Sequence, residues 1–166
     1  MTAADVSAIR MTQTVYDAYR ATIAKHPPET FAILGGSLDD YRVTDYRFCP
    51  PARDARGRLD ASRTHINVDA ELLNFIIDYE WKPNGKYLIG FWHSHPAGCT
   101  RPSIGDPITR QGDVAFLSAC LDNDDSPGRN WHTCLCPITT FKPDGSPGGD
   151  FGRPWQLGIS YTKHSD

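Results

Sequence analysis

Two histidines separated by one residue stand close before a serine and an aspartate. His93 and His95 flank Ser94 after an apolar run, and Ser103 and Asp106 follow a turn-rich segment. Residues two apart in a strand point to the same side, so the two imidazoles would lie side by side. Two neutral imidazoles make half of a zinc site, and catalytic zinc typically takes a third protein ligand and keeps one position for water. Asp106 is the natural candidate for that third ligand.

Glutamate is scarce in this chain, which narrows the search for a general base. Of the 20 acidic residues only three are glutamates, and Glu71 and Glu80 fall on one predicted helix. Glu29 instead stands just before the apolar run of residues 31–34, which reads as a buried strand. A carboxylate beside a metal-bound water can take its proton. The structural alternative is that Glu29 is a solvent-exposed residue at the edge of a strand, with no chemical role.

The other candidate residues also have structural interpretations. An isolated H-x-H arises by chance in alternating strands, and Ser103 with Asp106 also fits the S-x-x-D box that begins a helix. Cys99, between the histidines and Asp106, is expected to be a small buried residue, with a redox or inhibitory thiolate as the alternative. Core packing is favoured over a second metal site for three alternating residues, His132, Cys134 and Cys136.

The pattern of apolar residues predicts alternating strands and helices. Helices are expected over residues 11–25, about 72–79 and 113–121, and strands over 31–34, 41–49, 64–68, 87–92, 131–139 and 155–161. The strand of residues 87–92 would deliver the histidine pair at its end, where Pro96 stops the pairing. This order indicates a three-layer α/β/α sandwich with a mixed sheet, in a single domain spanning residues 1–166.

Composition excludes several partners. With 39% hydrophobic and 22% charged residues and a net charge of −3, the chain is typical of globular proteins and lacks the basic surface that grips nucleic acid. The N-terminal residues have no signal-peptide pattern, and no window approaches the ~20 apolar residues of a membrane span. Five cysteines, an odd number, do not suggest a disulfide framework. These features predict a cytoplasmic protein that binds neither nucleic acid nor membrane.

The motif as a whole resembles that of the JAMM/MPN+ (JAB) metalloprotease family. That family has H-x-H-P, six residues, S-x-x-D and an upstream Glu; here His93-Ser94-His95-Pro96, six residues and Ser103-Ile104-Gly105-Asp106 match without a gap. The strand that follows Glu29 and ends at Gly35-Gly36 fits as well, although Thr30-Phe31-Ala32 stands where many members have a Cys-Gly pair. The resemblance covers roughly residues 10–140 in element order.

The resemblance implies a JAB/MPN fold and one catalytic zinc ion held by His93, His95 and Asp106. Glu29 would move the proton of the attacking water to the leaving amine, and the Ser103 hydroxyl would donate to the oxyanion. The expected activity is hydrolysis of a peptide or isopeptide bond after the C-terminal Gly of a ubiquitin-like protein. The resemblance allows two roles for this cleavage, processing of the ubiquitin-like precursor and its removal from conjugates. It also implies a setting such as a bacterial conjugation or antiphage operon, whose other proteins would be further partners.

Two other functions stay open at this point. One is a non-catalytic MPN-type scaffold, although such relatives lose ligands that this chain keeps. The other is the same zinc chemistry on a sulfur-carrier adduct or on a phage-tail or cell-wall peptide. Substrate-facing walls are expected from residues 41–63 and from the Gly/Pro-rich residues 142–154.

Overall fold

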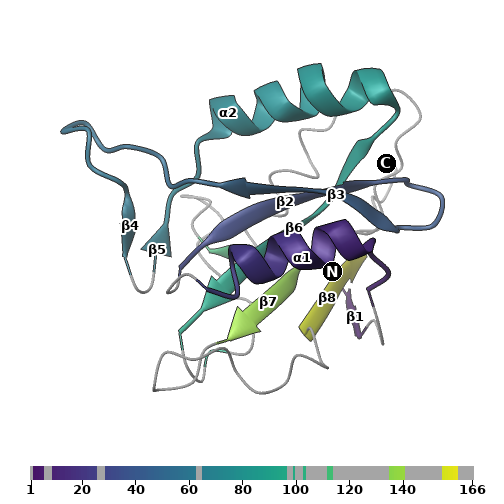
Figure 1. Ribbon diagram of the computed structural model, residues 1–166. Helices are drawn as coiled ribbons and strands as arrows, with labels where there is room; N and C mark the ends of the chain where they lie inside the picture. Colours follow the sequence, from purple (N-terminus) through teal and green to yellow (C-terminus); the bar gives the residue numbers. More distant parts are fainter. Residues whose placement is uncertain are drawn as a thin grey trace, which may run out of the picture.

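A mixed six-stranded β-sheet forms the centre of the fold (Figure 1). The computed structural model describes residues 2–5, 9–25, 29–62, 65–96, 99, 103, 112–113, 135–140 and 155–160. The sheet strands are β1 (Thr2–Asp5), β2 (Phe31–Gly36), β3 (Val43–Cys49), β6 (Tyr87–His95), β7 (Pro137–Thr140) and β8 (Trp155–Ser160). Their order is β1-β8-β7-β6-β2-β3. Only β6 and β7 run parallel, and the other neighbours are antiparallel.

Two helical segments accompany the sheet. Helix α1 spans Gln13–Ala21, and α2 (Ala70–Phe75) continues as a π-helix, Ile76–Trp81, and a short 3-10 turn, Lys82–Asn84. The side chains of Thr12 and Asp69 cap α1 and α2 by accepting hydrogen bonds from backbone amides of the first turn. Within the described residues, no helix is both long enough and apolar enough to cross a bilayer.

The two helical segments pack against opposite faces of the sheet. Alternate residues of β2 divide between two buried clusters: Phe31 and Ile33 pack with Leu73, Ile76 and Trp81 of the α2 segment. Ala32 and Leu34 pack with residues that belong to or follow α1, namely Val15, Tyr19, Ile23 and Ala24. The helices therefore cover both faces, and the predicted α/β fold with a mixed sheet is confirmed.

One extra residue in β6 changes which face its side chains occupy. Leu34 of β2 pairs with Gly90 but the next residue, Gly35, pairs with Leu88, so Ile89 is an inserted residue, a β-bulge. Leu88 packs on the α2 side, whereas Ile89 packs on the α1 side. Beyond the bulge Phe91 lies on the α2 side. Unbroken alternation from Leu88 would have placed Phe91 on the other face.

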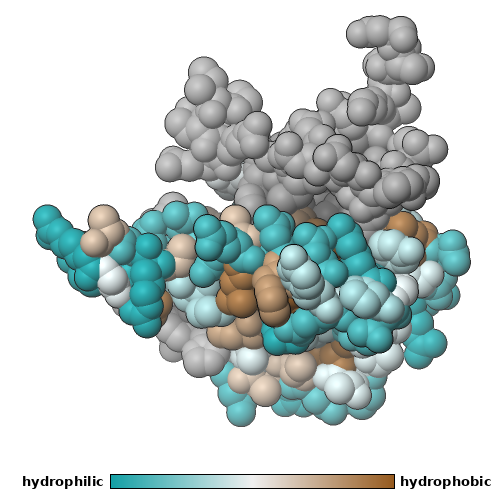
Figure 2. Space-filling model, turned by 90° about the horizontal axis from the view of Figure 1, so that it is seen from above, coloured by the Kyte–Doolittle hydropathy of each residue, from teal (hydrophilic) through white to brown (hydrophobic). Residues whose placement is uncertain are grey.

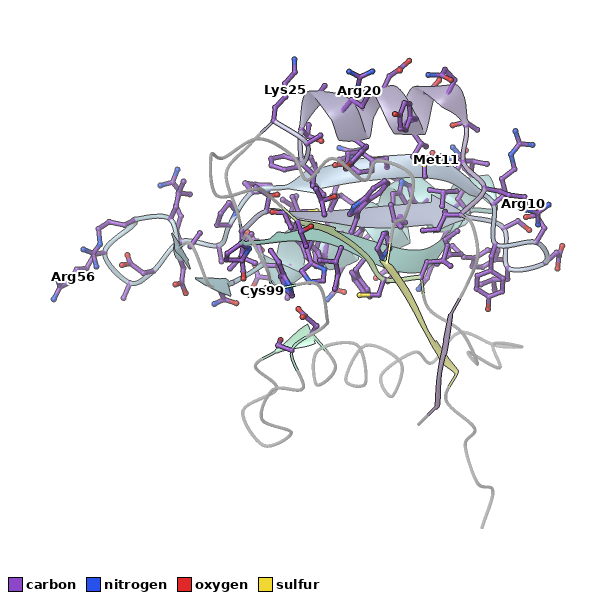
Figure 3. All side chains as sticks on the ribbon, turned by 90° about the horizontal axis from the view of Figure 1, so that it is seen from below. Arg10, Met11, Arg20, Lys25, Arg56 and Cys99 are labelled. Atoms are coloured by element: carbon purple, nitrogen blue, oxygen red, sulfur yellow. The ribbon has the colours of Figure 1, made fainter. Side chains whose placement is uncertain are left out.

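A narrow arm leaves the sheet between β3 and α2. It contains the two-stranded sheet β4 (Ala61–Ser62) and β5 (His65–Ile66) and projects to one side of the molecule (Figure 1). Arg56 lies at its tip, far from the sheet (Figure 3). Of the two predicted substrate walls, residues 41–63 thus comprise β3 and most of this arm, and residues 142–154 lie outside the described residues.

Several predicted elements have different bounds in the structure. The predicted helix of residues 11–25 ends at Ala21, because the backbone of Thr22 leaves the helical region while its hydroxyl donates to the carbonyl of Ala18 at 2.7 Å. Ile23 and Ala24 stay buried in the turn that follows, which explains why the apolar pattern continues past the helix. The predicted strand of residues 87–92 extends to His95. Strand β1 is not among the predicted elements.

Candidate metal centre

Strand β6 carries both histidines on the α2 face of the sheet. His93 and His95 continue the alternation of Phe91, so the bulge at Ile89 decides which face they occupy. Their exposed fractions are 5% and 6%. The sequence predicts a histidine pair at an open strand end, but the strand continues through both residues and buries them.

Asp113 completes a cluster of three potential ligands. The Nε2 atoms of His93 and His95 are 3.0 Å apart. Asp113 places Oδ1 at 3.1 Å from Nε2 of His93 and Oδ2 at 3.3 Å from Nε2 of His95. The three residues form a group able to hold a metal ion, with candidate ligand atoms within 4.8 Å of one another.

The spacing of these donors fits a zinc ion. Zinc–nitrogen and zinc–oxygen distances of about 2.0–2.2 Å in a tetrahedron put neighbouring ligand atoms roughly 3.3 Å apart. The two Nε2 atoms are 3.0 Å apart, and each faces a different oxygen of Asp113, Oδ1 at 3.1 Å from His93 and Oδ2 at 3.3 Å from His95, so the carboxylate lies close to both imidazoles. Two imidazoles with one carboxylate is also a ligand set that catalytic zinc uses, with the fourth position left for water. The residues present therefore fit the metal that the sequence motif implies.

Hydrogen bonds orient the donor atoms. Nδ1 of His95 lies 3.1 Å from the carbonyl oxygen of Cys99, which can only accept, so Nδ1 donates this bond. In the neutral imidazole Nε2 then keeps its lone pair for a metal, whereas in the imidazolium Nε2 also carries a proton and faces Asp113. The backbone amide of Cys99 in turn donates to the carbonyl of Pro96 at 3.1 Å. This short turn after β6 thus fixes the tautomer of His95.

The contacts in the cluster shift the pKa values of Asp113 and His95. Burial by itself raises the pKa of Asp113, but hydrogen bonds to His93 and His95 outweigh it and hold that pKa well below its usual range. Burial lowers the pKa of His95, yet the hydrogen bond and the negative charge of Asp113 reverse the effect and leave the pKa raised. The carboxylate is therefore charged at neutral pH, as a metal ligand must be.

Ser103 supports Asp113. The Ser103 amide and hydroxyl both donate to Oδ2 of Asp113, at 2.7 and 3.0 Å, and the Asp113 amide donates back to the Ser103 hydroxyl at 2.9 Å. These three bonds lock the aspartate in place. The structure thus brings Ser103 to the edge of the cluster, while its role as an oxyanion donor stays a prediction.

The other predicted ligand, Asp106, lies outside the described residues, so its place as third ligand also stays a prediction. Sequence reasoning used Asp113 only as the start of a predicted helix. Gly112, the residue before it, takes φ 98°, a left-handed conformation that favours glycine. A Gly-Asp pair is common in turns, so it did not mark Asp113 as a ligand in the sequence.

Glu29 lies just before β2, opposite the end of β6 that carries the histidine pair. Phe31 of β2 pairs with His93, and the amide of Ser94 donates to the carbonyl of Thr30 at 3.0 Å, so the antiparallel register continues toward Glu29 and His95. Residues opposite each other on one face have Cβ atoms about 4.5–5.5 Å apart. The charge of Glu29 does act on His95, where it helps to raise the pKa. Glu29 is therefore placed beside the cluster without belonging to it.

The cysteines divide between the core and the surface. Cys136 is buried against Phe31 and Phe91, as the core-packing prediction requires, and burial raises the pKa of its thiol. His132 and Cys134 lie outside the described residues. Cys99 is exposed, which contradicts the expectation that it is buried, and it lies on the side of the sheet away from α1 (Figure 3). Its backbone carbonyl, not its thiol, contacts the site.

A mixed β-sheet covered by helices on both faces, with two buried histidines at the end of a central strand and a half-buried aspartate beside them, defines an α/β domain with a candidate metal centre. The chain belongs to the family described as prokaryotic homologs of the JAB domain, whose family model matches residues 12–133. A search of curated proteins found no match.

Solved structures with a similar chain trace include two bacterial proteins. A solution structure from Salinibacter ruber is 19% identical, with a TM-score of 0.42, over 84% of this chain and 77% of that chain. A solution structure from Desulfitobacterium hafniense is 24% identical, with a TM-score of 0.46, over 85% of this chain and 90% of that chain.

Proposed function

We propose that the protein is a zinc-dependent peptidase or isopeptidase that hydrolyses the bond after the C-terminal Gly of a ubiquitin-like protein. The observation that carries the proposal is the convergence of His93, His95 and Asp113, with Glu29 two residues before the neighbouring strand β2 and close enough for its charge to act on His95. Membership of the JAB family supports the reaction class. The substrate rests on the resemblance of the H-x-H-P and S-x-x-D motifs to the JAMM/MPN+ pattern, and the cytoplasm is the compartment that the composition favours.

In this proposal each side chain has one task. His93, His95 and Asp113 hold the zinc ion, which when bound supplies a Lewis acid and lowers the pKa of a coordinated water from ~15.7 towards ~7. A carboxylate oxygen of Glu29 accepts the proton of the attacking water and returns it to the nitrogen of the leaving amine. The Ser103 hydroxyl, which donates to Asp113 at 3.0 Å, would have to turn to donate to the oxyanion.

The direct test is cleavage of a fusion in which a ubiquitin-like protein ending in Gly-Gly precedes a reporter. We expect intact-mass spectrometry to show release of the reporter after the second Gly, and a chelator to stop it. Zinc-loaded protein that cleaves no candidate fusion would favour the non-catalytic scaffold, and cleavage of a different peptide only would keep the chemistry and replace the substrate.

Replacing Glu29 separates proton transfer from metal binding. We expect Glu29→Gln to reduce kcat by about 10²–10⁴, the usual contribution of a general base, while the zinc content stays at one ion per chain. Glu71→Gln is the matched control, since Glu71 is exposed in the first turn of α2 and far along the chain from the cluster. Full activity of the Glu29→Gln protein would overturn the assignment of Glu29.

A further inference from the structure

Ser94 lies between the two candidate ligands but faces the other way. Its side chain shares the α1 face with Trp92, and its exposed fraction is 0%. The sequence assigns it no chemistry. Its hydroxyl nonetheless makes two hydrogen bonds, both to Thr30, the residue that follows Glu29.

These bonds replace part of the regular strand pairing. In an antiparallel ladder, a hydrogen-bonded pair of residues exchanges two backbone bonds. Thr30 and Ser94 make one of them, from the Ser94 amide to the Thr30 carbonyl at 3.0 Å. The Thr30 amide donates instead to the hydroxyl of Ser94, also at 3.0 Å. The side chain of Ser94 therefore sets how far apart β2 and β6 lie at this point.

A third hydrogen bond joins the side chains of the same two residues. The hydroxyls of Thr30 and Ser94 are 2.8 Å apart, and Thr30 is 9% exposed. Buried hydroxyls and amides that lose a partner are penalised by desolvation, so this arrangement resists sliding. We call these three bonds between Thr30 and Ser94 the strand clasp.

The strand clasp lies one residue from every group that the proposed reaction needs on these strands. Ser94 is flanked by His93 and His95, and Thr30 follows Glu29 directly. Any change in strand separation at the clasp therefore moves the Glu29 carboxylate relative to the metal ligands. We propose that Ser94 and Thr30 are positioning residues that hold Glu29 at its working distance from the metal centre; the catalytic part of this proposal rests on the proposed function.

Kinetics of the zinc-loaded protein test the catalytic part. We expect Ser94→Ala to lower kcat by roughly 10- to 100-fold, since displacement of a reacting group by about 1 Å can cost that much, with KM changed less than about twofold. Thr30→Val removes one hydroxyl at nearly constant shape and should show a smaller loss, while Thr30→Ser keeps the hydroxyl and should retain kcat. Thr30→Val also serves if the Ser94→Ala protein does not fold.

Two further readouts separate positioning from a general loss of structure. Zinc content, and the absorption spectrum of the cobalt-substituted protein, should match those of the parent, because the ligands themselves are unchanged. In a Glu29→Gln background, Ser94→Ala should have no further effect on the residual rate. Loss of zinc in Ser94→Ala, or an undiminished effect in the Glu29→Gln background, would overturn the proposal.

A crystal structure of the zinc-loaded Ser94→Ala protein decides the matter without any substrate. We expect the Glu29 carboxylate to shift by about 1 Å or more, or to occupy two conformers, with His93 and His95 in place. An unmoved Glu29 refutes the clasp whatever the activity. If the parent protein cleaves nothing but Glu29 does shift in the variant, the proposed function fails and the positioning role stands.

Discussion

Two aspartates compete for one role at the metal centre. Asp106 has the spacing of the S-x-x-D motif, whereas Asp113 has the observed geometry, with an oxygen within 3.3 Å of each histidine. Ser103 takes part in both descriptions, since it opens the motif and also holds Asp113 by three hydrogen bonds. Metal affinity distinguishes the two carboxylates.

Asparagine substitutions at the two positions make a matched pair. We expect Asp113→Asn to weaken zinc binding by more than about 100-fold, because the loss of a ligand exceeds the ~10–100-fold effect of an outer-shell partner. Asp106→Asn should change the affinity much less. Competition with a chromophoric chelator measures both. The reverse ranking would assign the third ligand to Asp106 and leave Asp113 as a neighbour of the histidine pair.

The histidines and Glu29 were predicted as candidates from strand periodicity, from the scarcity of glutamate and from the resemblance to the JAMM/MPN+ motif. Period two puts His93 and His95 on one face, and Glu29 is the only glutamate next to a buried strand. The partner of the histidines could not be found this way. It depends on the path of a long connection after Pro96, and no local pattern specifies where such a path brings a carboxylate.

At the scale of elements, the bulge in β6 is what turns the histidine pair toward Asp113. Phe91 packs on the α2 side only because Ile89 is inserted. Gly90, at the bulge, has no room for a side chain, since a Cβ there would overlap the carbonyl oxygen and Cβ of Leu135. Leu135 also receives a backbone hydrogen bond from Phe91 at 2.8 Å and donates one to Ile89 at 2.9 Å. Gly90 thus allows this close approach.

Gly90→Ala should therefore damage the metal centre from a distance. We expect a loss of about 1–3 kcal/mol in the free energy of unfolding, typical of overpacking, together with weaker zinc binding as β6 shifts. Gly85→Ala is the control. Gly85 has φ 66° and ends the 3-10 turn, so its replacement also destabilises, by about 1–2 kcal/mol, but leaves the zinc affinity unchanged. Equal effects of the two variants on zinc would contradict this role of the bulge.

The element boundaries show which signals the sequence carries. The helical pattern of Leu72, Phe75, Ile76 and Tyr79 predicts a helix, and the structure has one, but Phe75 and Tyr79 are exposed, and the segment buries Leu73, Ile76 and Trp81 instead. Their rings lie 5.2 Å apart. Figure 2 shows the molecule from this side, with a few hydrophobic side chains gathered among mostly hydrophilic ones. Strand β1 cannot be predicted from local sequence because Thr2–Asp5 does not alternate apolar and polar residues. It is defined by its antiparallel pairing with β8.

At the scale of the whole molecule, a buried series of hydrogen bonds joins α1, β6 and β7 on the face of the sheet opposite the candidate metal centre. The indole Nε1 of Trp92 donates to the hydroxyl of Thr139 at 3.0 Å, and that hydroxyl donates to the hydroxyl of Tyr19 at 3.1 Å. The rings of Tyr19 and Trp92 are stacked with centroids 3.9 Å apart. Burial raises the pKa of Tyr19, so its hydroxyl stays neutral. Helix α1, β6 and β7 are thereby held together.

Removing the middle hydroxyl tests this series of hydrogen bonds. Thr139→Val keeps the side-chain shape but leaves the Trp92 indole N–H buried without its acceptor, so we expect a loss of about 1–3 kcal/mol in the free energy of unfolding. Tyr19→Phe should lose less, roughly 0.5–1.5 kcal/mol, because only one bond disappears. Denaturant titration of the zinc-free proteins gives both values. Equal stabilities of Thr139→Val and the parent would show that the series contributes nothing to the fold.

The parallel pairing of β6 with β7 has a consequence for how the protein reaches this state during synthesis. His93 pairs with Ile138, and Thr30 contacts Ser94 across 64 residues of chain. Closing such long loops is entropically unfavourable and slows folding. A nascent chain that ends soon after the H-x-H-P motif therefore has both histidines but neither Asp113 nor the pairing with β7. Metal binding is expected to come late, after β7 has left the ribosome, so an incomplete chain would lack the candidate metal centre.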